Sequence, residues 1–184
     1  MDNFTVPNDN LDKHECPLAV IKCVDFRFRS SDQEFVERGL GFSDFDIYAW
    51  PGAAKDVLKN NGFKTSFIEY IVAVSRGLHK VKKLLLLWHW DCGGYGGSKA
   101  FSSVEEEESL QRKHLVRARD FIRDHFPLLV QDILRYGNPS PTERDNLIRV
   151  MGNGLLISGY VIKPKDMDNP SEDTEGGWFA ELVF

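Results

Sequence analysis

The stretch Leu84–Gly97, which reads LLLLWHWDCGGYGG, joins a run of aliphatic residues to a polar, glycine-rich turn. A short apolar run of this kind is typical of a strand that is buried on both faces of a parallel sheet. His89 and Cys92 follow the run, so we expect them at the carboxyl edge of the sheet, where open α/β folds hold their functional sites. Because two ligands do not complete a tetrahedral zinc site, this stretch predicts only part of a metal site.

The rest of the sequence alternates between predicted strands and predicted helices. Apolar, β-branched or aromatic runs predict strands at residues 18–24 (LAVIKCV), 45–50 (FDIYAW), 155–162 (LLISGYVI) and 178–184 (WFAELVF), the last as an edge strand or hairpin partner. Helical spacing of apolar residues predicts helices over 31–38, 63–78 and from Ser103 onwards. Residues 147–151 fit neither pattern alone. The alternation predicts an α/β fold with a mainly parallel sheet.

The helix expected after Ser103 carries several local signals. Ser103 and Glu106 have the spacing of a capping box. The four glutamates of Glu105–Glu108 suit the positive end of a helix, and we interpret them as a solvated first turn and not as an ion site. Pro127 is expected to break or restart the helix. Polar loops are predicted at residues 137–141 and 164–177.

A second predicted strand also ends in polar residues, and it supplies a candidate for the missing ligand. Cys23 lies at the end of the first predicted strand, and Asp25 and Arg27 follow it. Because neighbouring parallel strands end at the same edge of a sheet, we expect Cys23 to converge with His89 and Cys92. Two thiols and an imidazole are donors that zinc favours. We therefore predict a zinc site with these three ligands.

Two motifs together resemble those of the β-class carbonic anhydrases. They are C-x-D-x-R, with Cys23, Asp25 and Arg27, and H-x-D-C-G-G over His89–Gly94. The resemblance implies a four-stranded parallel sheet with an additional antiparallel edge strand and flanking helices. It also implies a homodimer or higher homo-oligomer, with the sites near the subunit interface.

The resemblance also assigns roles to the motif residues. Cys23, His89 and Cys92 would bind Zn²⁺. Asp25 and Arg27 would form a catalytic dyad, in which Arg27 orients and neutralises Asp25. Asp25 would then accept a hydrogen bond from the metal-bound hydroxide, or in a closed state ligate the metal itself.

The function that the resemblance implies is the reversible hydration of carbon dioxide to bicarbonate by a zinc enzyme. Two alternatives stay open: a zinc-binding module without turnover, and a hydrolase of a related small heterocumulene such as carbonyl sulfide or carbon disulfide. They are motivated by departures from the family pattern. Trp50-Pro51-Gly52 stands where the family commonly has Arg-Asn-Ala-Gly, Phe26 stands where serine is frequent, and Trp90 and Tyr95 are bulky additions near the site.

Composition narrows the class of protein. A chain of 184 residues with 42% hydrophobic and 28% charged residues predicts one folded domain, 18–184, after an amino-terminal arm, 1–17. The net charge of -5 argues against nucleic-acid binding, and no apolar run is long enough to span a membrane. We expect a cytoplasmic protein acting on a small-molecule substrate. Three cysteines do not form a disulfide framework, and Cys16 is expected to have no role.

The histidines outside the motif are interpreted as helix or surface residues: His14, His79, His114 and His125.

Overall fold

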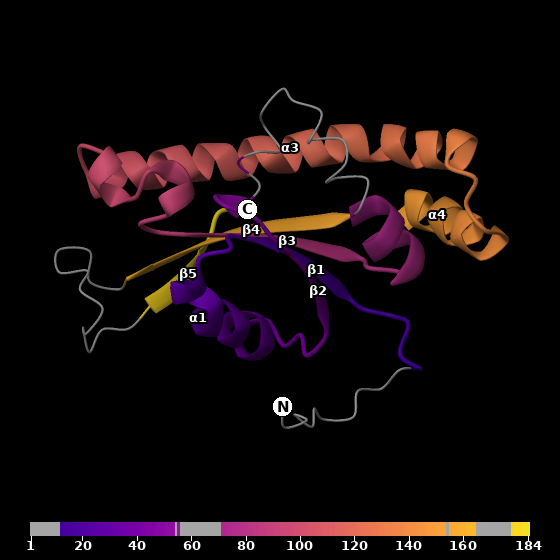
Figure 1. Ribbon diagram of the computed structural model, residues 1–184, viewed down its shortest axis with the longest axis horizontal. Helices are drawn as coiled ribbons and strands as arrows, with labels where there is room; N and C mark the ends of the chain where they lie inside the picture. The colour runs from indigo at the N-terminus through magenta and orange to yellow at the C-terminus, as the bar shows by residue number, and fades with distance from the viewer. Residues whose placement is uncertain (1–11, 54, 56–70, 154, 165–177) are drawn as a thin grey trace, which may run out of the picture.

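A five-stranded sheet forms the centre of the computed structural model, which describes residues 12–53, 55, 71–153, 155–164 and 178–184. The strand order is β2-β1-β3-β4-β5 (Figure 1). Four strands pair in parallel, and β5 pairs antiparallel with β4. The predicted fold class, a mainly parallel sheet with flanking helices and an antiparallel edge strand, is confirmed. The strands are β1 Leu18–Lys22, β2 Phe45–Ala49, β3 Lys83–His89, β4 Leu156–Pro164 and β5 Trp178–Leu182.

The register of β1 and β3 brings the two motifs to the same edge. Lys22, the last residue of β1, pairs with Leu87 of β3, two residues before His89. The first strand is therefore two residues shorter than predicted, and Cys23 comes directly after it. Both candidate ligand segments leave the sheet at its carboxyl edge.

Helices cover the two faces of the sheet. The helix α3, Val104–Tyr136, runs along one face, whereas α1, Arg29–Glu34, lies on the other (Figure 1). Alternate residues of β1 and β3 face each layer, because successive side chains of a strand point to opposite sides. The core beneath α3 includes Ala19, Ile21, Leu84, Leu86, Leu115, Ala118 and Ile122. The core on the opposite face includes Leu18, Val20, Phe28, Val36, Leu85 and Leu87.

The predicted break at Pro127 is wrong, because α3 continues through it. Pro127 is exposed, as is Arg123 one turn earlier, so water can solvate the carbonyl that loses its helical hydrogen bond. The opposite side of the helix is held in the core by Ile122, Phe126 and Val130. Tertiary packing therefore outweighs the local cost of the proline.

The start of α3 confirms half of the predicted capping box. Ser103 Oγ accepts a hydrogen bond from Glu106 N at 3.3 Å. The Glu106 carboxylate accepts from the backbone N–H of Ser102 (2.7 Å) and from its hydroxyl (2.6 Å), and not from Ser103 N as a reciprocal box requires. Ser103 therefore caps the helix as predicted, but the Glu106 side chain binds Ser102, one residue before the expected partner.

The remaining helices lie near their predicted positions. The predicted helix 31–38 is found as α1, which continues into wider π-helical turns over Phe35–Gly39. Of the predicted helix 63–78, residues 71–78 are helical and residues 63–70 lie outside the described residues. The helix α4, Pro141–Asn153, begins at the last residue of the predicted loop 137–141, and residues 147–151 are helical.

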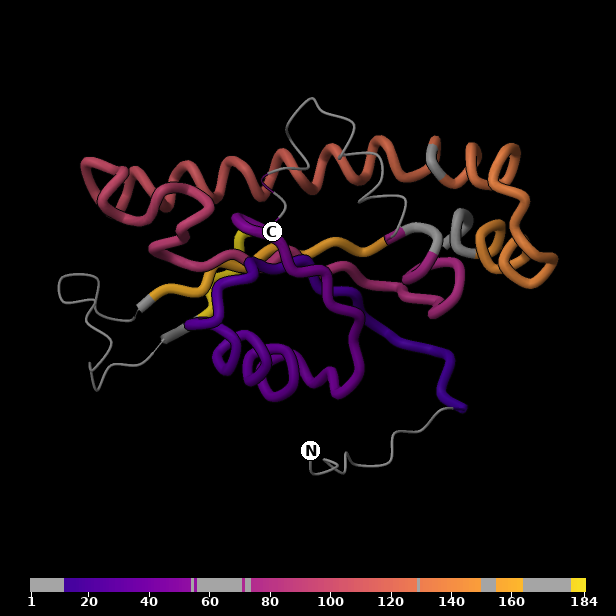
Figure 2. Tube along the Cα trace, in the orientation of Figure 1, coloured from indigo at the N-terminus to yellow at the C-terminus, as the bar shows by residue number. Residues whose placement is uncertain are grey.

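The chain ends at Phe184, beyond the edge strand β5 and beside Gly159 of β4 (Figure 2). Gly159 N of β4 donates to Phe184 O at 3.3 Å, and the Arg119 guanidinium of α3 lies 4.5 Å from the Phe184 ring centre.

Most of the predicted arm, residues 1–11, and the predicted loop over residues 165–177 lie outside the described residues. Among the helices that the structure describes, none has the length and apolar character needed to cross a bilayer.

Candidate metal centre

Three side chains meet at the carboxyl edge of the sheet. Cys23 follows β1, His89 is the last residue of β3, and Cys92 lies in the turn after it. One ligand atom from each lies within 4.8 Å of the other two, and the two Sγ atoms are 3.7 Å apart. All three side chains are buried. The structure thus brings together the three residues that the sequence predicted to converge.

The state of His89 fits a metal ion at this point. Its Nδ1 lies 2.8 Å from Trp90 O, and because a carbonyl only accepts, Nδ1 carries the proton. In the neutral imidazole Nε2 then presents a lone pair, and this nitrogen is buried without a hydrogen-bond partner among the described residues. A buried, unsatisfied nitrogen is costly. The Phe28 ring stacks on the imidazole at 4.0 Å and fixes its orientation. One imidazole and two thiols form a donor set that suits zinc.

The two thiols lie within hydrogen-bond distance of each other, with 3.7 Å between their Sγ atoms. The hydrogen bond from Cys92 lowers the pKa of Cys23, against the opposing effect of burial, and Gly52 N adds a contact to Cys23 Sγ at 3.4 Å. The same contact with Cys23, together with burial, raises the pKa of Cys92. The thiolate is the form of cysteine that binds metals, and the Gly52 N–H contact favours that form at Cys23.

Arg27 lies between two carboxylates beside the three donors. Its Nε donates to Asp25 Oδ1 at 3.0 Å and its Nη2 to Asp25 Oδ2 at 2.7 Å. These bonds hold the pKa of Asp25 below its ordinary value, so Asp25 is a carboxylate at neutral pH. Asp25 Oδ2 is 4.0 Å from His89 Nε2, which places the carboxylate next to the donor cluster and outside hydrogen-bond distance of it.

Asp91 holds the other side of Arg27, and sequence reasoning assigned it no role. Arg27 Nη1 donates to Asp91 Oδ2 at 2.8 Å. Asp91 has a positive φ of 52°, and its Oδ1 accepts from Ser98 N (2.8 Å) and Ser98 Oγ (2.9 Å), which closes the glycine-rich turn. Burial raises the pKa of Asp91, but the bonds from Arg27 and Ser98 outweigh this effect and leave the pKa lowered. The signal was an aspartate at the head of a glycine-rich turn, where this residue often binds backbone N–H groups.

The divergent stretch after β2 packs directly on the site. A Cβ placed on Gly94 would lie 2.3 Å from Gly52 N, so the two backbones touch only because residue 94 is glycine. Trp50 N donates to Lys22 O at 2.9 Å, which continues the pairing of β1 and β2 beyond their ends. The stretch therefore forms one wall of the candidate site.

Tyr95, one of the bulky residues expected near the site, has its side chain in the protein interior. It is 7% exposed, and its hydroxyl lies 2.9 Å from Trp88 Nε1 and 3.0 Å from His114 Nδ1. Because the indole N–H can only donate, the Tyr95 oxygen accepts from Trp88, and the same hydroxyl is hydrogen-bonded to His114. The interpretation of His114 as a surface or plain helix residue is therefore incomplete, since it ties α3 to the turn.

The interpretation of Glu105–Glu108 as a solvated turn is wrong for one member. Glu105 and Glu106 are exposed, but Glu107 is completely buried. Consecutive helical residues point in directions about 100° apart, so four in a row cannot all face water on a helix that lies against a sheet. Burial raises the pKa of Glu107.

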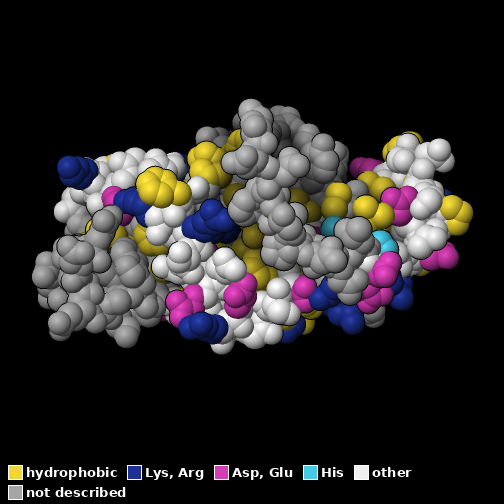
Figure 3. Space-filling model, turned by 60° about the horizontal axis from the view of Figure 1, so that its bottom comes forward, with side chains coloured by type: hydrophobic (Ala, Val, Ile, Leu, Met, Phe, Trp, Pro, Cys, Tyr) yellow, Lys and Arg dark blue, Asp and Glu magenta, His cyan; other side chains and the backbone are white. Residues whose placement is uncertain are grey.

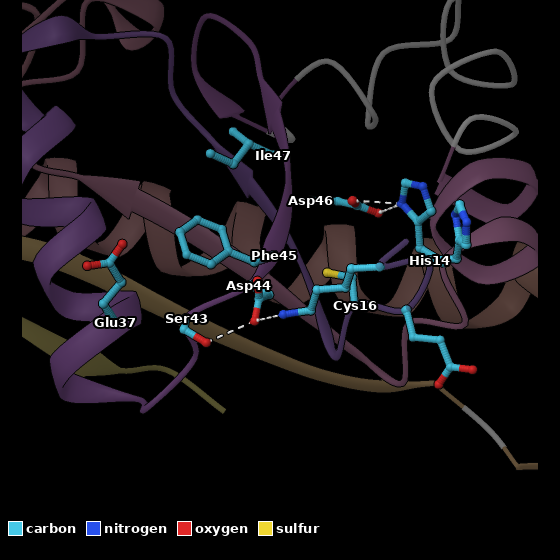
Figure 4. Close-up of a pocket in the computed structure, with 11 residues that line it drawn as sticks. His14, Cys16, Glu37, Ser43, Asp44, Phe45, Asp46 and Ile47 are labelled. Carbon is cyan, nitrogen blue, oxygen red and sulfur yellow. Dashed lines mark hydrogen bonds and ion pairs between the residues drawn. The ribbon is translucent and has the colours of Figure 1, made fainter. Parts of the chain in front are cut away.

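A separate cavity of about 380 Å³ lies at the amino ends of β1 and β2 (Figure 4). Its polar network joins His79 Nδ1 to Asp46 Oδ1 at 2.9 Å, and Ser75 Oγ donates to Asp46 Oδ2 at 2.5 Å. On the face of the molecule in Figure 3, histidine side chains lie among acidic and basic ones. Cys16 lines this cavity, and its Sγ donates to Leu18 O at 3.0 Å. The third cysteine therefore lies at the opposite end of β1 from Cys23.

A parallel sheet with an imidazole and two thiols at its carboxyl edge defines a class of α/β proteins with a candidate metal centre. A family model described as "Putative carbonic anhydrase" matches residues 13–131, and the chain belongs to this family. The matched range contains both motifs, and the resemblance inferred from them is confirmed at the level of the family.

The chain is also similar to individual proteins. An uncharacterized protein of Rickettsia conorii is 30% identical over 130 residues, which cover 67% of this chain and 69% of the relative. A second, from Rickettsia bellii, is 32% identical over 124 residues, covering 63% and 73%. Among solved structures, β-carbonic anhydrase isoform I of Trichomonas vaginalis matches with 18% identity and a TM-score of 0.35, over 98% of this chain and 88% of that one.

Proposed function

We propose that this protein catalyses the reversible hydration of carbon dioxide to bicarbonate, with a zinc ion held by Cys23, His89 and Cys92. The observation that carries the proposal is the convergence of these donors, in a chain of this family, beside a carboxylate that an arginine keeps ionised. The unsatisfied His89 Nε2 is the most direct support for a metal, because an ion would give this buried nitrogen a partner.

When bound, zinc supplies a Lewis acid that lowers the pKa of water from about 15.7 towards about 7. The chain's own groups act around it. Both oxygens of Asp25 accept hydrogen bonds from Arg27. These bonds hold the carboxylate in one orientation and keep it ionised. Asp25 then orients the attacking water by accepting one of its hydrogens, which directs an oxygen lone pair at the carbon of CO₂. The new C–O bond yields bicarbonate, and the proton lost from water passes to solvent.

One rival function has an observation in its favour. The stretch Trp50-Pro51-Gly52, which departs from the family's usual residues, lies against the site, and Gly52 N donates to Cys23 Sγ. A wall changed in this way is compatible with a module that binds zinc without turnover. Hydrolysis of a related heterocumulene would use the same residues and differs only in the molecule that the wall admits.

Zinc stoichiometry and stopped-flow CO₂ hydration on the metal-loaded protein test the proposal together. We expect one zinc per chain and hydration well above the buffer rate. One zinc per chain with hydration no faster than buffer would support the binding module instead. If carbonyl sulfide or carbon disulfide is consumed while CO₂ is not, the proposed substrate is wrong.

The ligand set is tested by a pair of matched cysteine variants. Cys92→Ser should reduce zinc to well below one per chain, because serine is a poor zinc ligand. Cys16→Ser makes the same change at the opposite end of β1 and should leave zinc at one per chain. Full metal content in Cys92→Ser would show that the ligands are other residues.

A further inference from the structure

Two buried polar residues of α3 face the turn that carries the candidate ligands. Glu107 is 0% exposed and Gln111 is 1% exposed. They are four residues apart, so they lie on the same face of the helix, one turn from each other. Polar side chains of this length are rarely fully buried unless they hold something.

Each of the two residues makes a hydrogen bond to the backbone of a candidate metal ligand. Gln111 Nε2 donates to His89 O at 3.0 Å, and the second hydrogen of the same amide goes to Glu107 Oε1 at 2.9 Å. Glu107 Oε1 also accepts from Cys92 N at 3.4 Å. The carbonyl of one ligand and the N–H of the other are thus joined to a single rigid helix.

We propose that Glu107 and Gln111 are positioning residues that clamp His89 and Cys92 in the geometry needed to bind the metal. The inference rests on the proposed zinc site, and it deepens that proposal by naming what sets the spacing of two of its ligands. The two peptide groups lie on either side of Trp90 and Asp91. Trp90 N still donates to Ile162 O of β4 at 2.8 Å, and Cys92 comes two residues later, in the turn beyond the paired part of β3. The clamp supplies the order that β-sheet pairing gives elsewhere.

The contact runs through one carboxylate oxygen. Glu107 Oε2 is buried and has no hydrogen-bond partner within the described part of the chain, so Oε1 alone links Glu107 to the turn. Loss of that acceptor would leave Cys92 N and one Gln111 N–H unpaired in the interior. Residues that orient metal ligands in this way typically change metal affinity by about 10–100-fold when they are replaced.

The test compares Glu107→Leu with Glu107→Gln. Leucine keeps the approximate volume of the side chain and removes the acceptor, whereas glutamine keeps an oxygen that can accept from both Cys92 N and Gln111. Zinc affinity, measured by competition with a chromophoric chelator, should fall about 10–100-fold in Glu107→Leu and stay within about threefold in Glu107→Gln. The d–d absorption of Co²⁺ bound in place of zinc should shift in the leucine variant alone.

Two further variants exclude simple loss of stability. Leu115→Ala, one turn beyond Gln111 on α3, should lower Tm and leave zinc affinity unchanged. Gln111→Ala provides a second break in the clamp in case Glu107→Leu does not fold. The clamp is overturned if Glu107→Gln loses as much zinc affinity as Glu107→Leu, or if Leu115→Ala loses as much as Gln111→Ala. It is also overturned if Glu107→Leu and Gln111→Ala both bind zinc as tightly as the parent. A parent protein that binds no zinc would instead refute the proposed function.

Discussion

At the scale of single residues, Arg27 is the centre of charge at the candidate site. It donates to Asp25 on one side and to Asp91 on the other, and these bonds raise the pKa of the guanidinium. One cation between two carboxylates leaves a net negative charge beside the three metal donors. A divalent cation at that point would offset this charge, which is consistent with a zinc site.

Replacement of Asp25 by Asn tests the role of the carboxylate. Asn keeps the shape of the side chain and loses its charge, so it cannot orient the attacking water in the same way. We expect unchanged zinc content and a fall in CO₂ hydration of about 10²–10⁴-fold, measured by stopped flow. Asp44→Asn is the matched control, because Asp44 pairs with Lys13 at the far end of the sheet. Equal rates in the Asp25 variant and the parent would remove Asp25 from the mechanism.

At the scale of elements, α3 contributes buried polar side chains to the candidate site that its sequence pattern did not predict. Its first two turns bring Glu107 and Gln111 to the ligand turn, and the next turn brings His114 to Tyr95. The helix is long enough to continue its packing on the core beyond Pro127. The position at which α3 begins therefore determines which of its polar residues face the candidate metal centre.

The Ser103 cap offers a test of how firmly that start is fixed. Ser103→Ala removes the acceptor for Glu106 N, and the free energy of unfolding should fall by about 1 kcal/mol in denaturant titration. Ser109→Ala makes the same chemical change at an exposed position within the helix, where alanine favours the helix by up to about 0.5 kcal/mol. A Ser103 variant as stable as the parent would show that the cap contributes nothing to α3.

At the scale of the whole molecule, the candidate site joins segments that are distant in sequence. Cys23 follows β1, while His89 and Cys92 belong to β3 and its turn, so a bound metal would link the two central strands. The exposed Val24 (51%) and Phe26 (84%) flank Asp25 on the same loop. The expectation of a homodimer or higher homo-oligomer stays a prediction.

Metal removal should therefore act on global stability. A ligand that binds only the folded state stabilises it by about 4 kcal/mol when its free concentration is about 1,000 times the dissociation constant. We expect a strong chelator to lower Tm of the parent and of Cys16→Ser, and to leave Cys92→Ser unchanged, in calorimetry with and without added zinc. The same Tm for the parent with and without chelator would show that no metal stabilises the fold.

The sequence by itself determined the parts of this protein that depend on local pattern. The aliphatic run Leu84–Leu87 predicts a buried central strand because its side chains are apolar on both faces. Parallel strands end at a common edge, so Cys23 could be placed near His89 and Cys92 from their positions after two such strands. The family resemblance added the expectation of an antiparallel edge strand, which β5 fulfils.

Only the tertiary structure decided which polar groups are buried and what they hold. A run of glutamates has the same local pattern whether the helix is free or packed, so the sequence could not separate Glu107 from its exposed neighbours. The contacts of Asp91 with Arg27 and of Gln111 with His89 O span 64 and 22 residues. Pro127 stays within α3 because residues far away in the chain pack against the helix and stabilise it. Local helix propensity does not depend on these contacts, so it could not predict the outcome.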